Sequence, residues 1–319
     1  YMFTIKQPST IIFGKYSARD YKIPKDSLVV TSPGAKSRNW FEYIGLTDSY
    51  IYDNVESNPS IEDAQQIISE FSNSKFSNVI GIGGGSVLDV AKFVAYKMKK
   101  IKIMIPTTFG SGSEVTRIAV LKVEGKKQSF HDDNIFADIA IIDPNFIHRT
   151  PEAIIKNSAI DACAQCTEGY DSKTGNLYTK FLCQKAFDIL ENAILNEKYE
   201  DLAYGSLCAG LGFGNTSTTL GHALSYVFSN EGISHGHALA FTTTVAHRFN
   251  ESVFYDRYKN LVRKLNFEEI NLKQNIENAA NLILLDRKHL DNNPKEISKS
   301  EITKLLGIIC DGKSFDDSS

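Results

Sequence analysis

The sequence predicts an α/β domain with a parallel sheet over residues 1–148, followed by an all-α domain over residues 149–319. In the first half, short apolar runs alternate with helical periodicity, which is typical of a doubly wound parallel sheet. After about residue 150 helical periodicity dominates and the strand-like runs fade. The length of 319 residues is also about that of two ordinary domains.

The predicted strands of the first domain are short runs rich in apolar and β-branched residues. Residues 3–14 predict two short strands around a Pro-Ser turn, and a helix is expected over about residues 61–71. The other strands are predicted at residues 27–31, 49–52, 79–82, 102–105 and 138–142. Parallel sheets bind ligands at the carboxyl ends of their strands. Ser32, the glycines at 83–85 and Thr107-Thr108 are expected at such ends.

The stretch VIGIGGGSVLDVAK, residues 79–92, predicts a cradle for a phosphate group. A buried strand leads into three glycines, which have no Cβ and let a ligand approach the backbone. Ser86 is expected to cap the next helix, whose free N–H groups suit an anion. Asp89 and Lys92 share a face of that helix. The spacing matches neither the usual dinucleotide fingerprint nor a Walker loop, and a tight turn without a ligand is the alternative.

The second domain is predicted to be a series of helices. They are expected over residues 151–171, 177–196, 199–213, 217–228, 237–250 and 255–265. Pro151 suits the first position of a helix. From Asn266 onward the sequence is polar and predicts Lys-rich helices, and the last seven residues, KSFDDSS, are expected to be loose.

The composition excludes several classes of protein. A net charge of −3 argues against a nucleic-acid-binding protein, and no apolar run reaches the roughly 18 residues of a membrane span. The five cysteines fit no secreted disulfide framework, so we expect a cytoplasmic protein. Cys163 and Cys166 lie inside a predicted helix, where we interpret them as small buried residues. A redox or zinc pair is the alternative.

A further group of polar residues in the second domain could bind a metal ion. Asp161 and Gln165 lie four residues apart on one predicted helix and so point the same way. His235 and His237 lie in a predicted Ser-His-Gly-His turn. One carboxylate and two imidazoles, from Asp161, His222 and His235, would suit Zn²⁺ or Fe²⁺, and Gln165 could add a neutral oxygen. The alternative is that each histidine is an ordinary surface or core residue.

Several motifs together are far more specific than each is alone. They are Gly83-Gly84-Gly85-Ser86-x-x-Asp89-x-Ala91-Lys92, Pro106-Thr107-Thr108-x-Gly110-Ser111-Gly112-Ser113-Glu114, Asp143-Pro144, Asp161-Ala162 and His222…His235-Gly236. In this order they resemble the iron-containing (group III) alcohol dehydrogenase family, from about residue 8 to about residue 250. The resemblance implies the dehydroquinate synthase-like architecture, in which a Rossmann-like nucleotide-binding domain precedes a helical, metal-binding catalytic domain.

The resemblance implies that Asp161, His222 and His235 hold Fe²⁺, or alternatively Zn²⁺. The family commonly has a histidine four residues after the aspartate, and here that position is Gln165, which becomes the fourth candidate ligand. A second histidine usually follows the first metal-binding histidine by four residues, and here it is replaced by Tyr226. Tyr226 and His237 are therefore the candidate catalytic residues on the proton route.

The resemblance also implies an NAD(H) or NADP(H) cofactor bound by the first domain. Its candidate ligands are Ser32, Asn58, Gly83, Gly84, Gly85, Ser86, Asp89, Thr107, Thr108, Ser113 and Lys127. Ser32 stands where NAD-preferring members carry an aspartate for the ribose 2′-hydroxyl. A carboxylate would repel a 2′-phosphate and a serine does not, while Lys36 or Arg38 could pair with the phosphate. NADP(H) use or dual specificity is therefore expected.

The function that the resemblance implies is a metal-dependent, NAD(P)H-linked alcohol dehydrogenase or aldehyde reductase. It would act on a small aldehyde or semialdehyde by hydride transfer, and a homodimer or higher homo-oligomer is expected. The alternatives are a lyase like dehydroquinate synthase, a polyol dehydrogenase like glycerol dehydrogenase, or a cofactor-binding protein without redox activity. Gln165 and Tyr226 give some weight to the last of these, and residues 106–114 argue against the lyase. The helical domain looks shorter than is common in the family.

Overall fold

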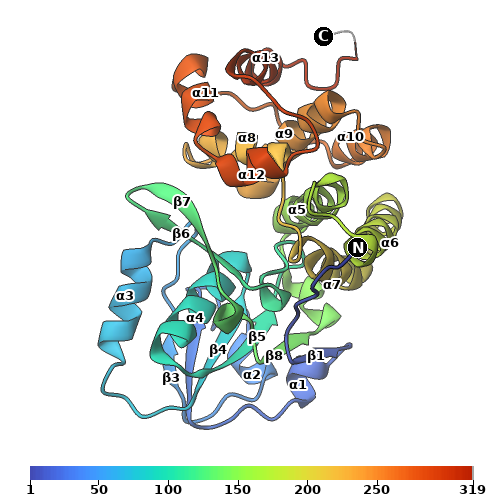
Figure 1. The fold of residues 1–319 in the computed structure, drawn as a ribbon. Helices are drawn as coiled ribbons and strands as arrows, with labels where there is room; N and C mark the ends of the chain where they lie inside the picture. Colours follow the sequence, from blue (N-terminus) through green and yellow to red (C-terminus); the bar gives the residue numbers. More distant parts are fainter. Residues whose placement is uncertain (318–319) are drawn as a thin grey trace. The chain divides into compact units, whose positions relative to one another are not determined.

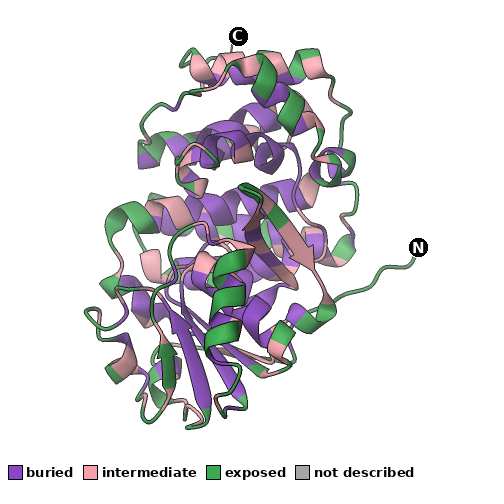
Figure 2. Ribbon diagram, turned by 90° about the vertical axis from the view of Figure 1, so that its left-hand side faces the viewer, coloured by how far each residue is buried: buried purple, intermediate pink, exposed green. Residues whose placement is uncertain are grey.

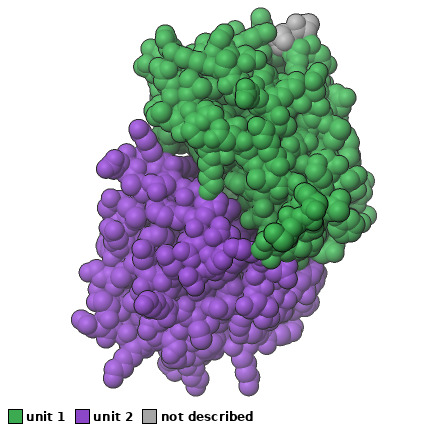
Figure 3. Space-filling model, viewed as in Figure 1, with its two compact units in different colours: residues 1–5, 152–319 green, residues 6–151 purple. Residues whose placement is uncertain are grey.

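The computed structural model describes residues 1–317 and divides the chain into two compact units (Figure 3). The α/β unit comprises residues 6–151. The helical unit comprises residues 1–5 and 152–319. None of the helices in the described part of the chain is long and apolar enough to cross a membrane.

The α/β unit is built on a six-stranded sheet with the order β1-β8-β5-β4-β2-β3 (Figure 1). The strands are β1 (Thr10–Phe13), β2 (Ser27–Thr31), β3 (Tyr50–Tyr52), β4 (Asn78–Gly83), β5 (Ile101–Pro106) and β8 (Ile139–Ile142). All neighbouring strands in this sheet are parallel. The helices are α1 (Ser17–Asp20), α2 (Trp40–Tyr43), α3 (Ile61–Glu70) and α4 (Gly85–Met98). The predicted parallel α/β sheet is therefore confirmed.

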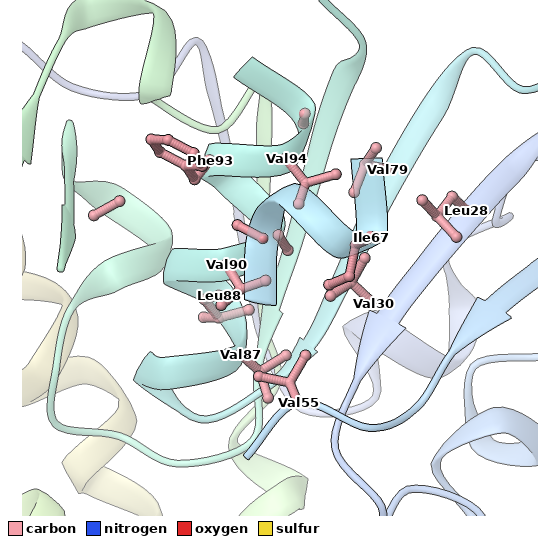
Figure 4. Close-up of a cluster of buried hydrophobic side chains, with 14 of the residues drawn as sticks. Leu28, Val30, Val55, Ile67, Val79, Val87, Leu88, Val90, Phe93 and Val94 are labelled. Atoms are coloured by element: carbon pink, nitrogen blue, oxygen red, sulfur yellow. The ribbon is translucent and has the colours of Figure 1, made fainter. Parts of the chain in front are cut away.

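The core of this unit lies between the sheet and the two longer helices. Every residue of β2 and β4 is buried, because a parallel sheet is covered on both faces (Figure 2). Leu28 of β2 and Val79 of β4 belong to one hydrophobic cluster with Val90 of α4 and Ile67 of α3 (Figure 4). This packing fixes the start of α4 against the end of β4.

The strands differ from the prediction in two places. The first of the two strands expected over residues 3–14 is absent, since no strand precedes Thr10 and Pro8, which lacks an N–H group, cannot donate to a ladder. The sequence analysis also missed an antiparallel hairpin of β6 (Ile118–Val123) and β7 (Lys126–His131). Its tight turn is made by Glu124 and Gly125, both with positive φ, which is the pattern that hairpin turns prefer.

The helical unit is confirmed as an all-α domain. Its helices are α5 (Glu152–Asp171), α6 (Leu177–Leu195), α7 (Leu202–Phe213), α8 (Leu220–Ser229), α9 (His235–Asn250), α10 (Tyr255–Leu265), α11 (Ile276–Leu284), α12 (Arg287–Asn292) and α13 (Lys299–Cys310). Cys163 and Cys166 are fully buried in α5, as predicted for small core residues.

The chain end was expected to be loose, but its described part is held in place. The ring of Phe315 packs on Phe241 with 5.6 Å between centroids, and Lys259 Nζ donates to the Asp317 carboxylate over 2.7 Å. Residues 318–319 lie outside the described part of the chain.

Candidate active site

The glycine turn joins β4 to α4. A Cβ on Gly83, whose φ is 155°, would lie 2.8 Å from the Val87 side chain, and a Cβ on Gly85 would lie 2.6 Å from Ser111 Oγ. Positions 83 and 85 of this turn therefore require glycine. Ser86 is not the helix cap, because α4 begins at Gly85 with Gly84 as its N-cap, and no side chain of the described residues caps it. The first N–H groups of α4 are thus left for a ligand, as in phosphate-binding turns.

Asp89 and Lys92 fasten a loop beside this turn. Lys92 is fully buried, and its Nζ donates to the carbonyl oxygens of Ser113 (2.7 Å) and Ile118 (2.5 Å). The Asp89 carboxylate accepts from Ser113 Oγ (2.6 Å) and Val120 N (3.1 Å). Burial lowers the pKa of Lys92 to about 8 and raises the pKa of Asp89. Two of the cofactor candidates, Asp89 and Ser113, are therefore hydrogen-bonded to each other and hold the loop in place.

The other cofactor candidates lie on the strands and loops around the turn. Ser32 follows β2 and Thr107 follows β5, and these two strands flank β4 in the sheet. Thr107 N donates to Gly83 O over 2.9 Å, and a Cβ on Gly84 would lie 3.3 Å from Thr108 Oγ1.

The two remaining candidates belong to the region of the hairpin. Asn58, with a left-handed φ of 53°, precedes Pro59, whose carbonyl oxygen accepts from Lys122 N of β6. Lys127 is the candidate whose position the sequence does not set, because the hairpin was not predicted. It lies in β7, directly opposite Lys122.

The structure brings Asp161, His222 and His235 together from three helices of the helical unit. His235 Nε2 lies 3.4 Å and His222 Nε2 lies 3.8 Å from Asp161 Oδ1. This oxygen is buried and has no hydrogen-bond partner among the described residues. Metal–ligand bonds of roughly 2.0–2.2 Å put neighbouring ligand atoms roughly 3.0–3.6 Å apart. The 3.4 Å separation lies in this range and the 3.8 Å separation slightly exceeds it, so a divalent cation such as Fe²⁺ or Zn²⁺ would draw His222 slightly inward.

The charges of this cluster depend on one another. Burial disfavours the Asp161 carboxylate, but His235 and His222 hold its pKa below the usual range. Burial also disfavours a charged His222, yet the carboxylates of Glu168 and Asp161 raise its pKa to about 9. A metal ion must therefore compete with a proton for His222, because it binds only the neutral ring.

Of the other residues predicted for the centre, Gln165 and Tyr226 lie near it and His237 faces away from it. Gln165 is buried and lies one turn after Asp161 on α5. The ring of Tyr226 stacks on that of His235 with 6.4 Å between centroids. His237, in the first turn of α9 rather than in a loop, donates from Nε2 to Glu268 O over 2.5 Å. Residues two positions apart in an α-helix are rotated by about 200° around its axis, so His237 faces away from His235.

The sequence analysis missed Glu168, which holds His222 in place. His222 Nδ1 donates to Glu168 Oε2 over 2.8 Å, and Thr243 Oγ1 donates to the same oxygen over 2.9 Å. The backbone N–H groups of Thr219 and His222 donate to Oε1, each over 3.0 Å. Burial works against this charge, but His222 lowers the pKa of Glu168 to about 2. Asp161 and Glu168 are seven residues apart, and this helical spacing is the signal that could have found Glu168.

The sequence analysis also missed His289 of α12. Its ring is nearly parallel to that of His222, with 6.3 Å between centroids, and stands edge-on to Tyr226 at 5.6 Å. His289 is 5% exposed, and its Nδ1 lies 2.8 Å from an oxygen of Asp286. The Asp-x-x-His spacing at the start of a helix was the available sequence signal.

Comparison with known families places both units. The model described as "Iron-containing alcohol dehydrogenase" matches residues 8–144. The model described as "Fe-containing alcohol dehydrogenase family, C-terminal" matches residues 155–283.

Two curated relatives illustrate the level of similarity. The 4-hydroxybutyrate dehydrogenase of Clostridium kluyveri is 33% identical over 209 residues, which cover 56% of this chain and 56% of that protein. Long-chain-alcohol dehydrogenase 1 of Geobacillus thermodenitrificans is 33% identical over 258 residues, which cover 68% of this chain and 64% of that protein. The chain thus spans between 56% and 64% of the length of these relatives.

Solved structures share the fold. An iron-containing alcohol dehydrogenase from Thermotoga maritima matches with a TM-score of 0.86 and 22% identity, over 97% of this chain and 100% of that chain. The sulfoacetaldehyde reductase of Bifidobacterium kashiwanohense, solved with NAD⁺, matches with a TM-score of 0.85 and 23% identity, over 97% and 99% of the two chains. At these identities the likeness shows the fold alone.

Proposed function

The chain belongs to the iron-containing alcohol dehydrogenase family, and we propose that it is a metal-dependent alcohol dehydrogenase or aldehyde reductase using NAD(P)(H). The observation that carries this proposal is the cluster of Asp161, His222 and His235, with a buried carboxylate oxygen that has no hydrogen-bond partner among the described residues. The glycine turn of the α/β unit supplies the second requirement, a site for the pyrophosphate of the cofactor.

Each residue of the centre has a task that its contacts support. Asp161, His222 and His235 would hold the cation, which when bound polarises the carbonyl group of the substrate. Glu168 accepts the Nδ1–H of His222 and so leaves the lone pair of Nε2 directed toward the metal position. Tyr226 covers the ring of His235 and would border the substrate.

We propose a small aldehyde or semialdehyde as the substrate. The relative from Clostridium kluyveri, named as a 4-hydroxybutyrate dehydrogenase, supports a short chain with a distal acid group. Comparing a four-carbon semialdehyde that carries a carboxylate with the unbranched aldehyde of the same length tests this preference directly.

For the cofactor we propose NADP(H), or use of both cofactors. Ser32 presents no carboxylate that would repel a 2′-phosphate. The Arg38 guanidinium folds back over Gly34 beside it, where a Cβ would lie 2.6 Å from Arg38 Nη1, and it lies 5.4 Å from the ring of Trp40. A guanidinium held near the end of β2 supports a phosphate contact.

We further propose a homo-oligomer formed through the N-terminal strands. β1 is an edge strand of the sheet, and an edge offers unpaired backbone groups to a second copy. Light scattering of the purified chain would give its mass, and a monomer at all concentrations would reject this part of the proposal.

The test of the function is an assay of NADPH and NADH oxidation with a panel of small aldehydes, with metal analysis of the same sample. We expect turnover by the Fe²⁺- or Zn²⁺-loaded protein and none after chelation. His235→Ala should lose metal and activity together, because Asp161 Oδ1 then keeps only His222 as a neighbouring ligand. An active, metal-free His235→Ala protein would show that the metal has no role.

A further inference from the structure

His289 belongs to the wall of the metal centre, although it comes from a helix beyond the segment that the family model matches. Its ring lies against two residues of the centre, parallel to the ligand His222 and edge-on to Tyr226. Both of these neighbours are on α8, so His289 packs against the part of α8 that carries the candidate ligand His222. The side chain is 6% exposed and therefore fixed in this position.

The position of α12 is set by hydrogen bonds to the segment that leads into α8. Asn292 Nδ2 donates to the carbonyl oxygens of Thr216 (2.8 Å) and Thr218 (3.1 Å). Leu220 N donates to Asn293 Oδ1 over 3.4 Å. The helix that carries His289 is thus tied to the helix that carries His222.

Asp286 sets the orientation of the His289 ring. Its two carboxylate oxygens lie 2.9 and 2.8 Å from Nδ1, so this nitrogen carries a hydrogen and donates it. The other nitrogen, Nε2, lies on the opposite side of the ring and has a lone pair in the neutral imidazole. No residue of the described chain forms a hydrogen bond with Nε2. The ring is 6% exposed beside the metal centre, so Nε2 is held in place and is available to a ligand bound there.

We propose that His289 contacts the substrate, accepting at Nε2 a hydrogen bond from the hydroxyl group of the alcohol. Asp286 is then a positioning residue, which fixes the ring and keeps Nε2 as the acceptor. This inference rests on the proposed function. It assigns the polar contact beside the centre to α12, where the sequence analysis had offered only Tyr226 and His237.

The test compares two substitutions and a control on the same helix. His289→Leu removes the acceptor at similar volume, whereas His289→Gln keeps an oxygen near the position of Nε2. Asp291→Asn is the matched control, because its exposed carboxylate pairs with Arg287 one turn away on α12. For each protein we would measure KM for the alcohol, KM for the oxidised cofactor and metal per chain.

A second measurement does not depend on turnover. The dissociation constant of the alcohol is obtained from the visible absorption of the Co²⁺-loaded protein. We expect His289→Leu to weaken alcohol binding and raise its KM by about 5- to 100-fold, because the hydroxyl group of the alcohol is left without its acceptor. His289→Gln should recover most of this loss, and metal content and the cofactor KM should not change.

The outcomes separate the two proposals. If native protein oxidises alcohols and His289→Leu keeps the alcohol KM and dissociation constant within twofold, the role of His289 is rejected. The same holds if His289→Leu loses metal or if Asp291→Asn behaves like it, because the effect is then structural. If the native, metal-loaded protein oxidises no alcohol and reduces no aldehyde, the proposed function itself fails.

Discussion

Replacing Glu168 by glutamine should weaken metal binding while the fold is retained. The carboxylate accepts from His222 Nδ1 and Thr243 Oγ1 on one oxygen, and from two backbone N–H groups on the other. A glutamine has only one carbonyl oxygen, so it can serve one of these sides. Turning its NH₂ toward the backbone would leave two buried donors unpaired, at about 1–3 kcal/mol each. The NH₂ is therefore expected to face His222.

The consequence falls on the metal-binding nitrogen. His222 must then accept from the new NH₂ group at Nδ1, so that the neutral ring carries its hydrogen on Nε2, which cannot bind a cation. Loss of such a supporting carboxylate typically lowers metal affinity by about 10- to 100-fold, or about 1.4–2.7 kcal/mol. We expect this loss together with a small change in the melting temperature of the metal-free protein.

The assay is a chelator competition titration with Fe²⁺ or Zn²⁺, followed by metal analysis and thermal denaturation of the metal-free proteins. Glu152→Gln is the matched control, because Glu152 lies on the same helix, is largely exposed and pairs with Lys156 on that helix. If Glu168→Gln binds the metal as tightly as the native protein does, the argument from the His222 tautomer is wrong.

Three further predictions concern the α/β unit. Burial raises the pKa of Glu114 to about 7 from 4.5, so the folded state holds this proton more tightly than the unfolded state does. The free energy of unfolding should therefore fall as pH rises from about 4.5 to 7, and denaturant titrations of Glu114→Gln should lack this fall. Gly85→Ala, whose Cβ would lie 2.6 Å from Ser111 Oγ, should destabilise the unit by about 1–3 kcal/mol and weaken cofactor binding, measured by denaturation and by the fluorescence of bound NADPH. Ser32→Asp should shift kcat/KM toward NADH and Arg38→Ala should reduce it for NADPH alone; unchanged ratios would reject the phosphate contact.

The sequence predicted those parts of the fold whose structure depends on the local pattern of a single element. β2 and β4 are apolar runs buried on both faces, and the glycine turn is marked by residues that nothing else would replace. The hairpin of β6 and β7 was missed because its strands mix lysines with apolar residues, and its position depends on the buried Lys92. Ser86 was taken for a cap because the sequence does not show that α4 starts two residues earlier, with Gly84 as its cap.

The candidate site was harder to predict, because its residues come from separate helices. The candidate ligands Asp161, His222 and His235 could be named from the resemblance, but their spacing in the chain carries no geometric information. Glu168 was missed although it shares a face of α5 with Asp161, since a buried glutamate shows its role only through its partners. His289 was missed because only the folded chain brings α12 against α8.

Gln165 and Tyr226 stand where the family commonly has histidines, and this gave some weight to the alternative of a cofactor-binding protein without redox activity. The folded chain favours a working metal centre instead, because burying carboxylates lowers stability and brings no benefit to a protein without metal chemistry. Asp161 Oδ1 is buried without a hydrogen-bond partner among the described residues, and its charge is offset only by the electrostatic effect of His235 and His222 in that part of the chain. Glu168 is likewise buried and holds His222 in the tautomer that a metal needs. A binding protein without redox chemistry would need neither carboxylate, so the pair argues for a working metal centre.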